Sequence, residues 1–376
     1  MPQLIYLYTS GGAPKCDMHN ILSIESIPVC VTRNRYAIGA ETDGMVNMFK
    51  TMQKSGYFDS AHVIIDSCVE TGVINLNLHS FIYVMPSLSW VRHLLMPGDI
   101  VIVRGGFKPW LPFLDYLYKL RENWILFYRA NTNRGHWPFW DITLNDLISE
   151  PQVIRGRLHY NFTKPVNEGI FGVIDAPNVM KREYDVMIGA SHIHRRKGQF
   201  LVVKALQEHY RIFGEKPKAI LPGGYLRCST NSEIHQILKS GDVDIEGPRA
   251  MNRNQLAWAM NRSKLFVHAG PGGQNDRGIL EAMACGCVPM LYGKGHVSPV
   301  IWDNSCHITQ DPCNLAQSIH TALSTYSDLY EPDIYKKING LHEVAIPKMA
   351  RLLEFLVQHP KPDRKAVCNW VMNRRD

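Results

Sequence analysis

The chain has 376 residues, 45% of them hydrophobic and 20% charged, and a net charge of +7. This composition is that of a globular protein, and the length exceeds that of one usual domain, so two domains are expected. No apolar run approaches the roughly 18 residues that a membrane-spanning helix needs, which predicts a protein without a transmembrane segment. The amino terminus lacks the basic region of a signal peptide, and the nine cysteines form no CxxC pair. Both features favour a cytoplasmic protein with reduced thiols over a disulfide framework or a zinc protein.

The net charge is unevenly distributed along the chain. Residues 1–175 hold 15 of the 41 basic and 15 of the 34 acidic side chains, so the remaining 26 basic and 19 acidic side chains carry the whole excess of +7. A basic second half suits a bound polyanion such as a nucleoside diphosphate, although a solvated Lys/Arg surface has the same composition.

The first half contains short apolar runs that predict buried strands. They lie at residues 4–8, 62–66, 99–103 and 124–128. The first run leads into Gly11 and Gly12, which open the backbone at its carboxyl end. After the last run, the stretch 161–183 has no clear period and holds two prolines and two glycines, so the boundary between the domains is expected there.

The second half alternates strands with helices. Strands are predicted at residues 186–190, 218–221, 265–268 and 288–292, and helices at 199–210, 254–260, 276–285 and 314–325. Such alternation predicts a parallel α/β architecture. We therefore expect two doubly wound, Rossmann-like domains, at residues 1–170 and 171–350, which face each other across a cleft and bind ligands at the carboxyl ends of their strands.

The end of the chain predicts two helices. One is amphipathic and covers residues 346–357, the other covers 364–373, and a proline-containing break at 359–363 separates them. A kinked pair of this kind allows residues 351–376 to cross back and pack toward the N-terminal domain. Simple surface helices are the alternative.

The segment GPGGQNDRGILEAMACGCVP, residues 270–289, follows a predicted strand and opens a helix. Three glycines between 270 and 273 free the backbone, apolar residues from Ile279 to Ala284 recur with helical spacing, and Gly286 ends the helix. Because a glycine-rich turn before a helix offers free N–H groups and the positive end of the helix dipole, the segment predicts an anion site. Its usual occupant is a phosphate.

Four segments of the second half together resemble the retaining glycosyltransferases of the GT-B fold, family-4 type. They are SHIHRRKGQ (191–199), LPGG (221–224), EGPR (246–249) and GILEAMACGCVP (278–289), the last close to that family's L-E-A-M-A-x-G-x-P. The resemblance covers about residues 186–345, while the first half matches chiefly through Gly11 and Gly12. It implies a nucleotide-diphosphate sugar as donor substrate, no metal and no other cofactor.

The resemblance also implies roles for individual residues. Lys197 matches the lysine that stabilises charge on the β-phosphate, and Arg196 is a second cation beside it. Glu281 matches the glutamate that binds the donor ribose; a carboxylate within an apolar helix face needs partners, and two ribose hydroxyls supply them. The sequence departs from the family's motif at two positions. His192 stands where the family often has arginine. Gly273 stands where it has a glutamate that contacts the transferred sugar, so the identity of the sugar is left open. The expected donor-binding set is Gly11, Gly12, Gly272, Gly273, Gln274, Glu281 and Arg249.

The first half supplies candidates for acceptor binding and catalysis. The strand at 124–128 leads into a polar, aromatic loop that contains Arg129, Arg134 and His136. Family members carry a histidine near this point that faces the donor sugar. Arg129 stands roughly at that place, and His136 is the nearest histidine, so it is the catalytic candidate, with a structural loop histidine as the alternative. Arg104, Arg129 and Arg134 belong to a basic strip interleaved with aromatic side chains, which predicts acceptor binding.

The leading hypothesis is therefore a retaining hexosyl- or pentosyltransferase that acts on an acceptor hydroxyl of a glycan or small molecule. A glycosyltransferase acting on a hydroxymethylated DNA base is the alternative that the basic strip keeps open. A nucleotide-sugar 2-epimerase and a non-catalytic nucleotide-sugar-binding protein are further alternatives; Gly273 argues against the first, and Lys197 with Glu281 against the second. Asp242-Val-Asp244 follows Lys239-Ser-Gly241 in a loop of the second domain, and His192-x-His194 has no third ligand, so no metal site is predicted at either.

Overall fold

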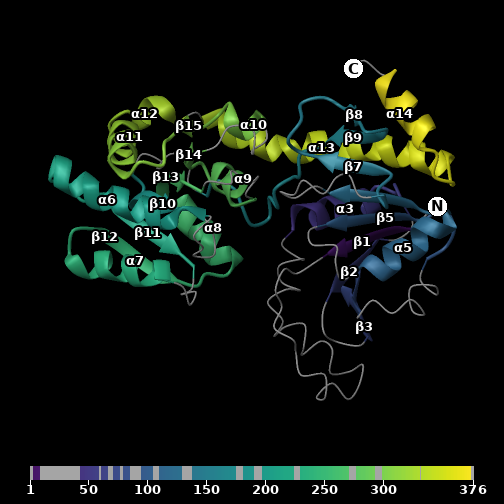
Figure 1. Ribbon diagram of the computed structural model, residues 1–376, viewed down its shortest axis with the longest axis horizontal. Coiled ribbons are helices and arrows are strands. Elements are labelled where there is room, and N and C mark those ends of the chain that lie inside the picture. The colour runs from purple at the N-terminus through teal and green to yellow at the C-terminus, as the bar shows by residue number, and fades with distance from the viewer. Residues whose placement is uncertain are drawn as a thin grey trace. The chain divides into compact units, whose positions relative to one another are not determined.

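The computed structural model describes residues 3–8, 43–58, 61–66, 71–76, 79–84, 95–104, 110–128, 138–174, 181–189, 197–223, 229–270, 277–292, 299–330 and 332–373. The contacts divide the chain into two compact units, labelled in Figure 1 by their helices and strands. Unit 1 comprises Met1–Pro165 together with His342–Asp376, and unit 2 comprises Val166–Leu341. The boundary after Pro165 lies in the irregular stretch 161–183. Every helix in the ranges given above is too short or too polar to cross a membrane.

Unit 1 is built on a sheet of nine described strands in the order β3-β4-β2-β1-β5-β6-β7-β9-β8. Seven of them run parallel, and only the outermost strands β3 and β8 are antiparallel to their neighbours. Numbered by chain position, the parallel strands follow the Rossmann order 3-2-1-4-5-6, extended by one strand. The strands are β1 (Leu4–Tyr8), β2 (Ala61–Asp66), β3 (Thr71–Leu76), β4 (His79–Val84), β5 (Ile100–Arg104), β6 (Trp124–Tyr128), β7 (Ile142–Asn145), β8 (Gln152–Ile154) and β9 (Arg157–Asn161).

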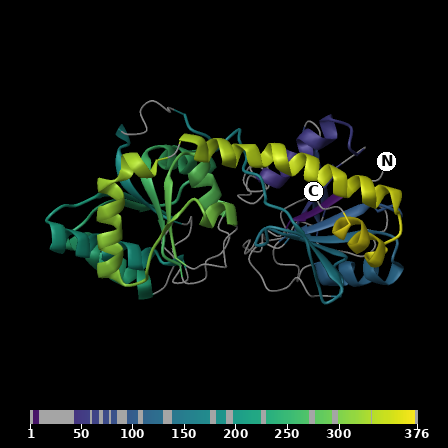
Figure 2. The ribbon, with the colours of Figure 1, turned by 90° about the horizontal axis from the view of Figure 1, so that it is seen from above.

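Helices cover both faces of the unit 1 sheet. Alternate strand residues point to opposite sides and therefore contact different helices. On β1, Leu4 and Tyr6 pack with α3 (Gly44–Lys54), α13 (Pro332–Gln358) and α14 (Arg364–Met372), while Ile5 and Leu7 pack with α5 (Leu111–Leu120). Figure 2 shows α3 in purple and α13 in yellow on one side of this sheet and α5 in blue on the other.

The C-terminal helices are tied to unit 1 by specific contacts. The Trp124 indole donates a hydrogen bond of 2.7 Å to the His359 carbonyl, and the Arg364 guanidinium pairs with buried Asp141 at 2.9 Å. Helix α13 begins at Pro332 rather than at the predicted residue 346, and Pro347 lies inside it. It starts in unit 2 and belongs to unit 1 from His342 onward.

Unit 2 is built on a six-stranded sheet, among the described residues, in the order β12-β11-β10-β13-β14-β15. All its neighbouring strands are parallel, and by chain position the order is 3-2-1-4-5-6. Both sheets thus have Rossmann topology, which confirms the predicted α/β class with two doubly wound domains. The strands are β10 (Tyr184–Ile188), β11 (Lys218–Pro222), β12 (Asp244–Arg249), β13 (Ser263–His268), β14 (Val288–Leu291) and β15 (Cys306–His307).

The unit 2 core also has two sides. On β10, Val186 and Ile188 belong to the cluster with α6, α7 and α11, and Met187 belongs to the cluster with α8, α9 and α10. The helices of this unit before α13 are α6 (Gln199–Phe213), α7 (Ser229–Ser240), α8 (Arg253–Asn261), α9 (Arg277–Ala284), α10 (Pro299–Trp302), α11 (Pro312–Ser324) and α12 (Tyr326–Leu329).

Candidate active site

The candidate site in unit 2 lies where the strand order reverses. Strands β10 and β13 are neighbours in the sheet, and their carboxyl ends lead into Gly189 and into Ala269 and Gly270. The backbone N–H of Gly189 donates to the Val267 carbonyl at 2.8 Å, which holds the two strand ends together. In open α/β sheets, ligands bind at the carboxyl edge beside such a reversal.

A close backbone contact brings Lys197 to this point. Gly198 has φ = +75°, and a Cβ built on it would lie 2.5 Å from the Gly270 nitrogen and nearer still to the Ala269 carbonyl group. Only glycine permits this approach, because any side chain would collide with backbone. The contact therefore holds the backbone of Lys197, one residue earlier, near Gly270, the first residue of the glycine-rich loop.

The N-terminus of α6 supplies the same point with partial positive charge. The helix begins directly after Gly198, which provides no side-chain cap, and its first turn contains no acidic residue. The N–H groups of a first helical turn and the positive end of the helix dipole favour an anion, and the first turn of α6 has no carboxylate to oppose it.

Glu281 lies on α9, the helix that follows the glycine-rich loop. It is 2% exposed, and both of its oxygens are bound by the Arg253 guanidinium: Nη1 donates to Oε2 at 3.0 Å, and Nη2 donates to Oε1. The same guanidinium lies over the Phe171 ring, 4.6 Å from its centre. The carboxylate is buried as expected, and within the described part of the chain it has a partner that the sequence did not predict.

Arg249 lies apart from these residues in the sheet. It is the last residue of β12, the outer strand, two strands from β10. Its guanidinium is half-exposed, pairs with Glu246 at 2.8 Å and lies over the Trp258 ring. The structure therefore places Lys197 and Gly270 together, but gives Arg249 partners on its own edge of the sheet.

In unit 1, Arg104 ends β5 at the corresponding reversal of strand order, beside the end of β1. Its guanidinium forms an ion pair with Asp43, and so does the ammonium group of Lys164. Asp43 is fully buried and also caps α3, because its carboxylate accepts the Met45 N–H at 2.9 Å. The predicted acceptor residue Arg104 is thus part of a buried ion-pair cluster of one carboxylate and two cations.

A second polar pair lies one strand farther along this edge. The Tyr128 hydroxyl donates to Asp146 at 2.9 Å, and both residues are buried. Burial, together with the charge of Asp146, raises the pKa of Tyr128 well above its usual value, so the phenol stays protonated and acts as a donor.

The other predicted site residues lie outside the described residues. This applies to Gly11, Gly12, Arg129, Arg134, His136, Arg196, Gly272, Gly273 and Gln274, and to His192. In the described part of the chain, no group of three or more His, Cys, Asp or Glu side chains is arranged to hold a metal ion. Asp242, of the Asp242-Val-Asp244 pair, accepts a hydrogen bond of 2.7 Å from Gln207.

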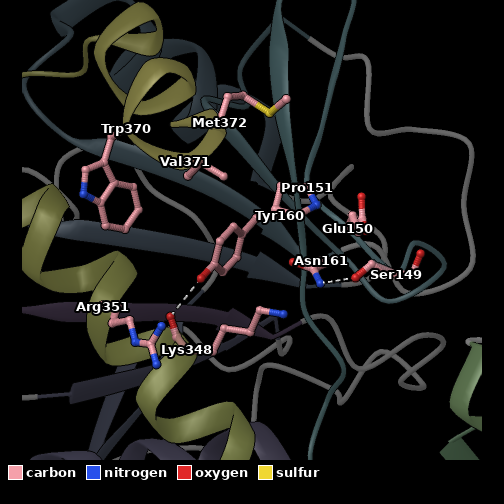
Figure 3. Close-up of a pocket in the computed structure, with 10 residues that line it drawn as sticks. All are labelled: Ser149, Glu150, Pro151, Tyr160, Asn161, Lys348, Arg351, Trp370, Val371 and Met372. Carbon is pink, nitrogen blue, oxygen red and sulfur yellow. Dashed lines mark hydrogen bonds between the residues drawn. The ribbon is translucent and has the colours of Figure 1, made fainter. Parts of the chain in front are cut away.

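Unit 1 also contains a pocket of about 640 Å³ near the carboxyl end of β9 (Figure 3). Its walls come from the loop before β8, from β9 and from α13 and α14. Tyr160 stands in it with its hydroxyl donating to the Lys348 carbonyl at 3.2 Å. None of the described residues predicted from sequence lines it. The lining residues are Ser149, Glu150, Pro151, Tyr160, Asn161, Lys348, Arg351, Trp370, Val371 and Met372.

No protein-family model and no curated protein sequence matches the chain. Solved structures are similar over nearly its whole length. Sucrose-phosphate synthase from Thermosynechococcus elongatus has 12% identity and a TM-score of 0.64, with 96% of this chain and 100% of that one covered. Anabaena HepE, in complex with UDP and glucose, has 14% identity and a TM-score of 0.55, with 96% and 98% covered. A trehalose-6-phosphate synthase, studied for glycosyl transfer with retention, has 10% identity and a TM-score of 0.56, with 93% and 99% covered.

These similarities define the class of fold. The chain has the GT-B fold of these structures, with its two Rossmann-like domains, which confirms the fold expected from the sequence segments around Lys197 and Glu281.

Proposed function

We propose that the chain is a glycosyltransferase that moves a sugar from a nucleoside diphosphate to an acceptor hydroxyl, with retention of configuration and without a metal ion. One observation carries the proposal. Lys197, the start of α6 and Gly270 meet at the carboxyl edge where the unit 2 sheet reverses its order, and Glu281 lies on α9, the helix after the glycine-rich loop. The structures with the same fold support it, since one holds UDP and glucose and another is studied for transfer with retention.

The chemistry of this arrangement suits a departing diphosphate. As the bond between the sugar and the phosphate oxygen breaks, negative charge grows on the β-phosphate. A fixed ammonium group and helix N–H groups at that position stabilise the transition state more than the ground state. We assign these roles to Lys197, with Arg196 as a second cation, and to the backbone of Gly272, Gly273 and Gln274.

The remaining roles follow from the same proposal. Glu281 accepts hydrogen bonds from the donor ribose, and Gly11, Gly12 and Arg249 complete the donor-binding set. Unit 1 binds the acceptor, and the sequence assigns His136 to catalysis and Arg104, Arg129 and Arg134 to acceptor binding. Because Arg104 is held by buried Asp43, its contribution is to carry a fixed positive charge at the strand edge.

Three alternatives predict different products. A 2-epimerase converts the nucleotide sugar without releasing the nucleoside diphosphate. A non-catalytic binding protein binds the nucleotide sugar and leaves it unchanged. A transferase that modifies a DNA base transfers sugar to hydroxymethylated duplex DNA and binds duplex with an affinity that falls steeply with salt.

The test is a screen of UDP-, GDP-, ADP- and dTDP-sugars for release of nucleoside diphosphate, with glycan, small-molecule and DNA acceptors and with or without chelator. We expect release from one donor class that persists in excess chelator. Lys197→Ala should lower the rate about a hundredfold or more, because it removes a fixed charge at the growing anion. Lys204, exposed on the same helix, provides the matched control, and Lys204→Ala should keep the full rate. A donor that binds but is never turned over, or full turnover by the Lys197 variant, contradicts the proposal.

A further inference from the structure

The peptide that joins Ala269 to Gly270 lies between the end of β13 and the glycine-rich loop. Its Ala269 carbonyl accepts a hydrogen bond of 3.1 Å from the side-chain amide of Gln310, a residue 41 positions farther along the chain. Gly198 packs on the same peptide, since a Cβ built on it would lie 2.5 Å from the Gly270 nitrogen. One peptide is therefore contacted by two elements, the start of α6 and the segment between β15 and α11.

Gln310 reaches this carbonyl from a backbone that is fixed on both sides. Two residues earlier, the Ile308 N–H donates to the Leu291 carbonyl at 2.9 Å, which continues the pairing of β15 with β14. One residue later, Asp311 caps α11 by accepting the Asn314 N–H at 2.9 Å. Because β14 lies between β13 and β15 in the sheet, the Gln310 side chain spans the end of β14 to reach β13.

The peptide between Ala269 and Gly270 needs such a partner because its own chain leaves its direction open. Glycine adopts positive and negative φ with similar ease, so Gly270 itself offers little resistance to a rotation of this peptide. The C=O and N–H groups of a trans peptide point in opposite directions. A donor that fixes the Ala269 carbonyl therefore also fixes the direction of the Gly270 N–H, the first N–H of the glycine-rich loop.

We propose that Gln310 is a positioning residue that holds this peptide in one orientation, so that the glycine-rich loop starts in the direction that presents its N–H groups to the β-phosphate. Such groups stabilise charge best when they are oriented before the charge appears. The inference rests on the proposed function, because it takes the loop as the diphosphate site. It assigns to Gln310 no contact with the donor.

The test compares nucleotides with and without the β-phosphate. Affinities of the full chain for UDP, GDP, ADP and dTDP and for the corresponding monophosphates are measured by calorimetry. In the unaltered protein the preferred diphosphate should bind about tenfold or more tightly than its monophosphate, since hydrogen bonds to a charged group are gained. Gln310→Met keeps the length of the side chain without its N–H donor. In this variant the ratio of the two affinities should fall about threefold or more, through weaker binding of the diphosphate.

The matched control is Gln207, which is also half-buried and donates to Asp242 at 2.7 Å, two residues before β12 begins. Gln207→Met should keep the ratio of the unaltered protein. An unaltered affinity of Gln310→Met for the monophosphate shows that the rest of the site is folded.

Three outcomes contradict the inference, and they differ in what else they overturn. If the ratio in Gln310→Met equals that in Gln207→Met, the hydrogen bond does not orient the loop, and the proposed function stands without it. If Gln310→Met loses affinity for both nucleotides by the same factor, the bond only stabilises the fold. If the unaltered protein prefers no diphosphate over its monophosphate, the diphosphate site itself fails, and this inference falls with it.

Discussion

The backbone contact of Gly198 with Ala269 and Gly270 predicts that Gly198→Ala changes both stability and turnover. The new Cβ would have to sit about where the Ala269 carbonyl and the Gly270 nitrogen already are, so the start of α6 and the start of the glycine-rich loop must move apart. We expect this variant to be less stable and to turn over more slowly, because Lys197 is displaced from the loop.

The magnitude follows from comparison with Gly214, at the other end of the same helix. Gly198 and Gly214 have φ values of +75° and +72°, but a Cβ on Gly214 would meet nothing within 4 Å. Gly214→Ala therefore costs only the left-handed backbone conformation, about 1–2 kcal/mol. Gly198→Ala adds an overpacking cost of about 1–3 kcal/mol, since carbon atoms prefer separations of about 3.5–4.0 Å. Its total is about 2–5 kcal/mol.

The assay is urea unfolding of both variants, with donor turnover measured in parallel. A displacement of about 1 Å at a reacting group lowers turnover about a hundredfold, and we expect this for Gly198→Ala and not for Gly214→Ala. Equal free energies of unfolding for the two variants, or full activity of the first, would refute the reasoning that links Lys197 to the loop through Gly198.

Three further predictions concern groups away from the loop. Asp43→Asn removes the carboxylate shared by two cations in unit 1 and should lower the free energy of unfolding by about 3–5 kcal/mol in urea titrations; a loss below about 1 kcal/mol contradicts a structural role for the cluster. Burial lowers the pKa of His209, so the unfolded chain takes up its proton first and this residue's contribution to stability is lost as the pH falls below about 6.5. Between about pH 7.5 and pH 5.5, the unfolding midpoint of His209→Gln should therefore fall less than that of the unaltered protein. An equal fall in both proteins contradicts this role of His209. Iodoacetamide should label exposed Cys313 in the folded protein but not Cys285 and Cys287, because burial raises their pKa values, that of Cys287 to about 11; equal labelling by peptide mass spectrometry contradicts the buried placement.

The strands of both sheets were predictable where they are buried on both faces. The runs at 4–8 and 265–268 match β1 and β13 because central parallel strands are continuously apolar. Edge elements gave weaker signals. Strand β12 is half-exposed and contains Glu246, Gly247 and Pro248, so its sequence resembles a loop, and its place is set by pairing with β11. Helix α3, which was not predicted, begins after Asp43, a residue type that often caps helices.

The site was predictable in its local parts and not in its long-range partners. The glycine that ends α9 was expected at 286, and it has φ = +81°. The sequence did not show that a Cβ there would also lie 2.6 Å from the guanidinium of Arg182, which binds the carbonyls of Ser263 and Cys285. Contacts of this kind join residues about a hundred positions apart, and no periodic pattern relates them. The contact of Gly198 with Ala269 and Gly270 is of the same type.

Glu281 shows what this limit means for the functional argument. The sequence reasoning held that a carboxylate within an apolar helix face needs partners, and the residue is indeed buried and paired. The chain supplies that partner itself, so the burial of Glu281 is accounted for by Arg253 and is not evidence for a ribose. The argument for a ribose therefore lies in the place of α9 directly after the glycine-rich loop. For this reason Glu281→Ala is a blunt test: it would weaken nucleotide binding about tenfold or more, but it also leaves the Arg253 cation without its carboxylate. Calorimetry that compares a ribonucleotide with its 2′,3′-dideoxy analogue in the unaltered protein disturbs no ion pair, and it measures the ribose contact alone.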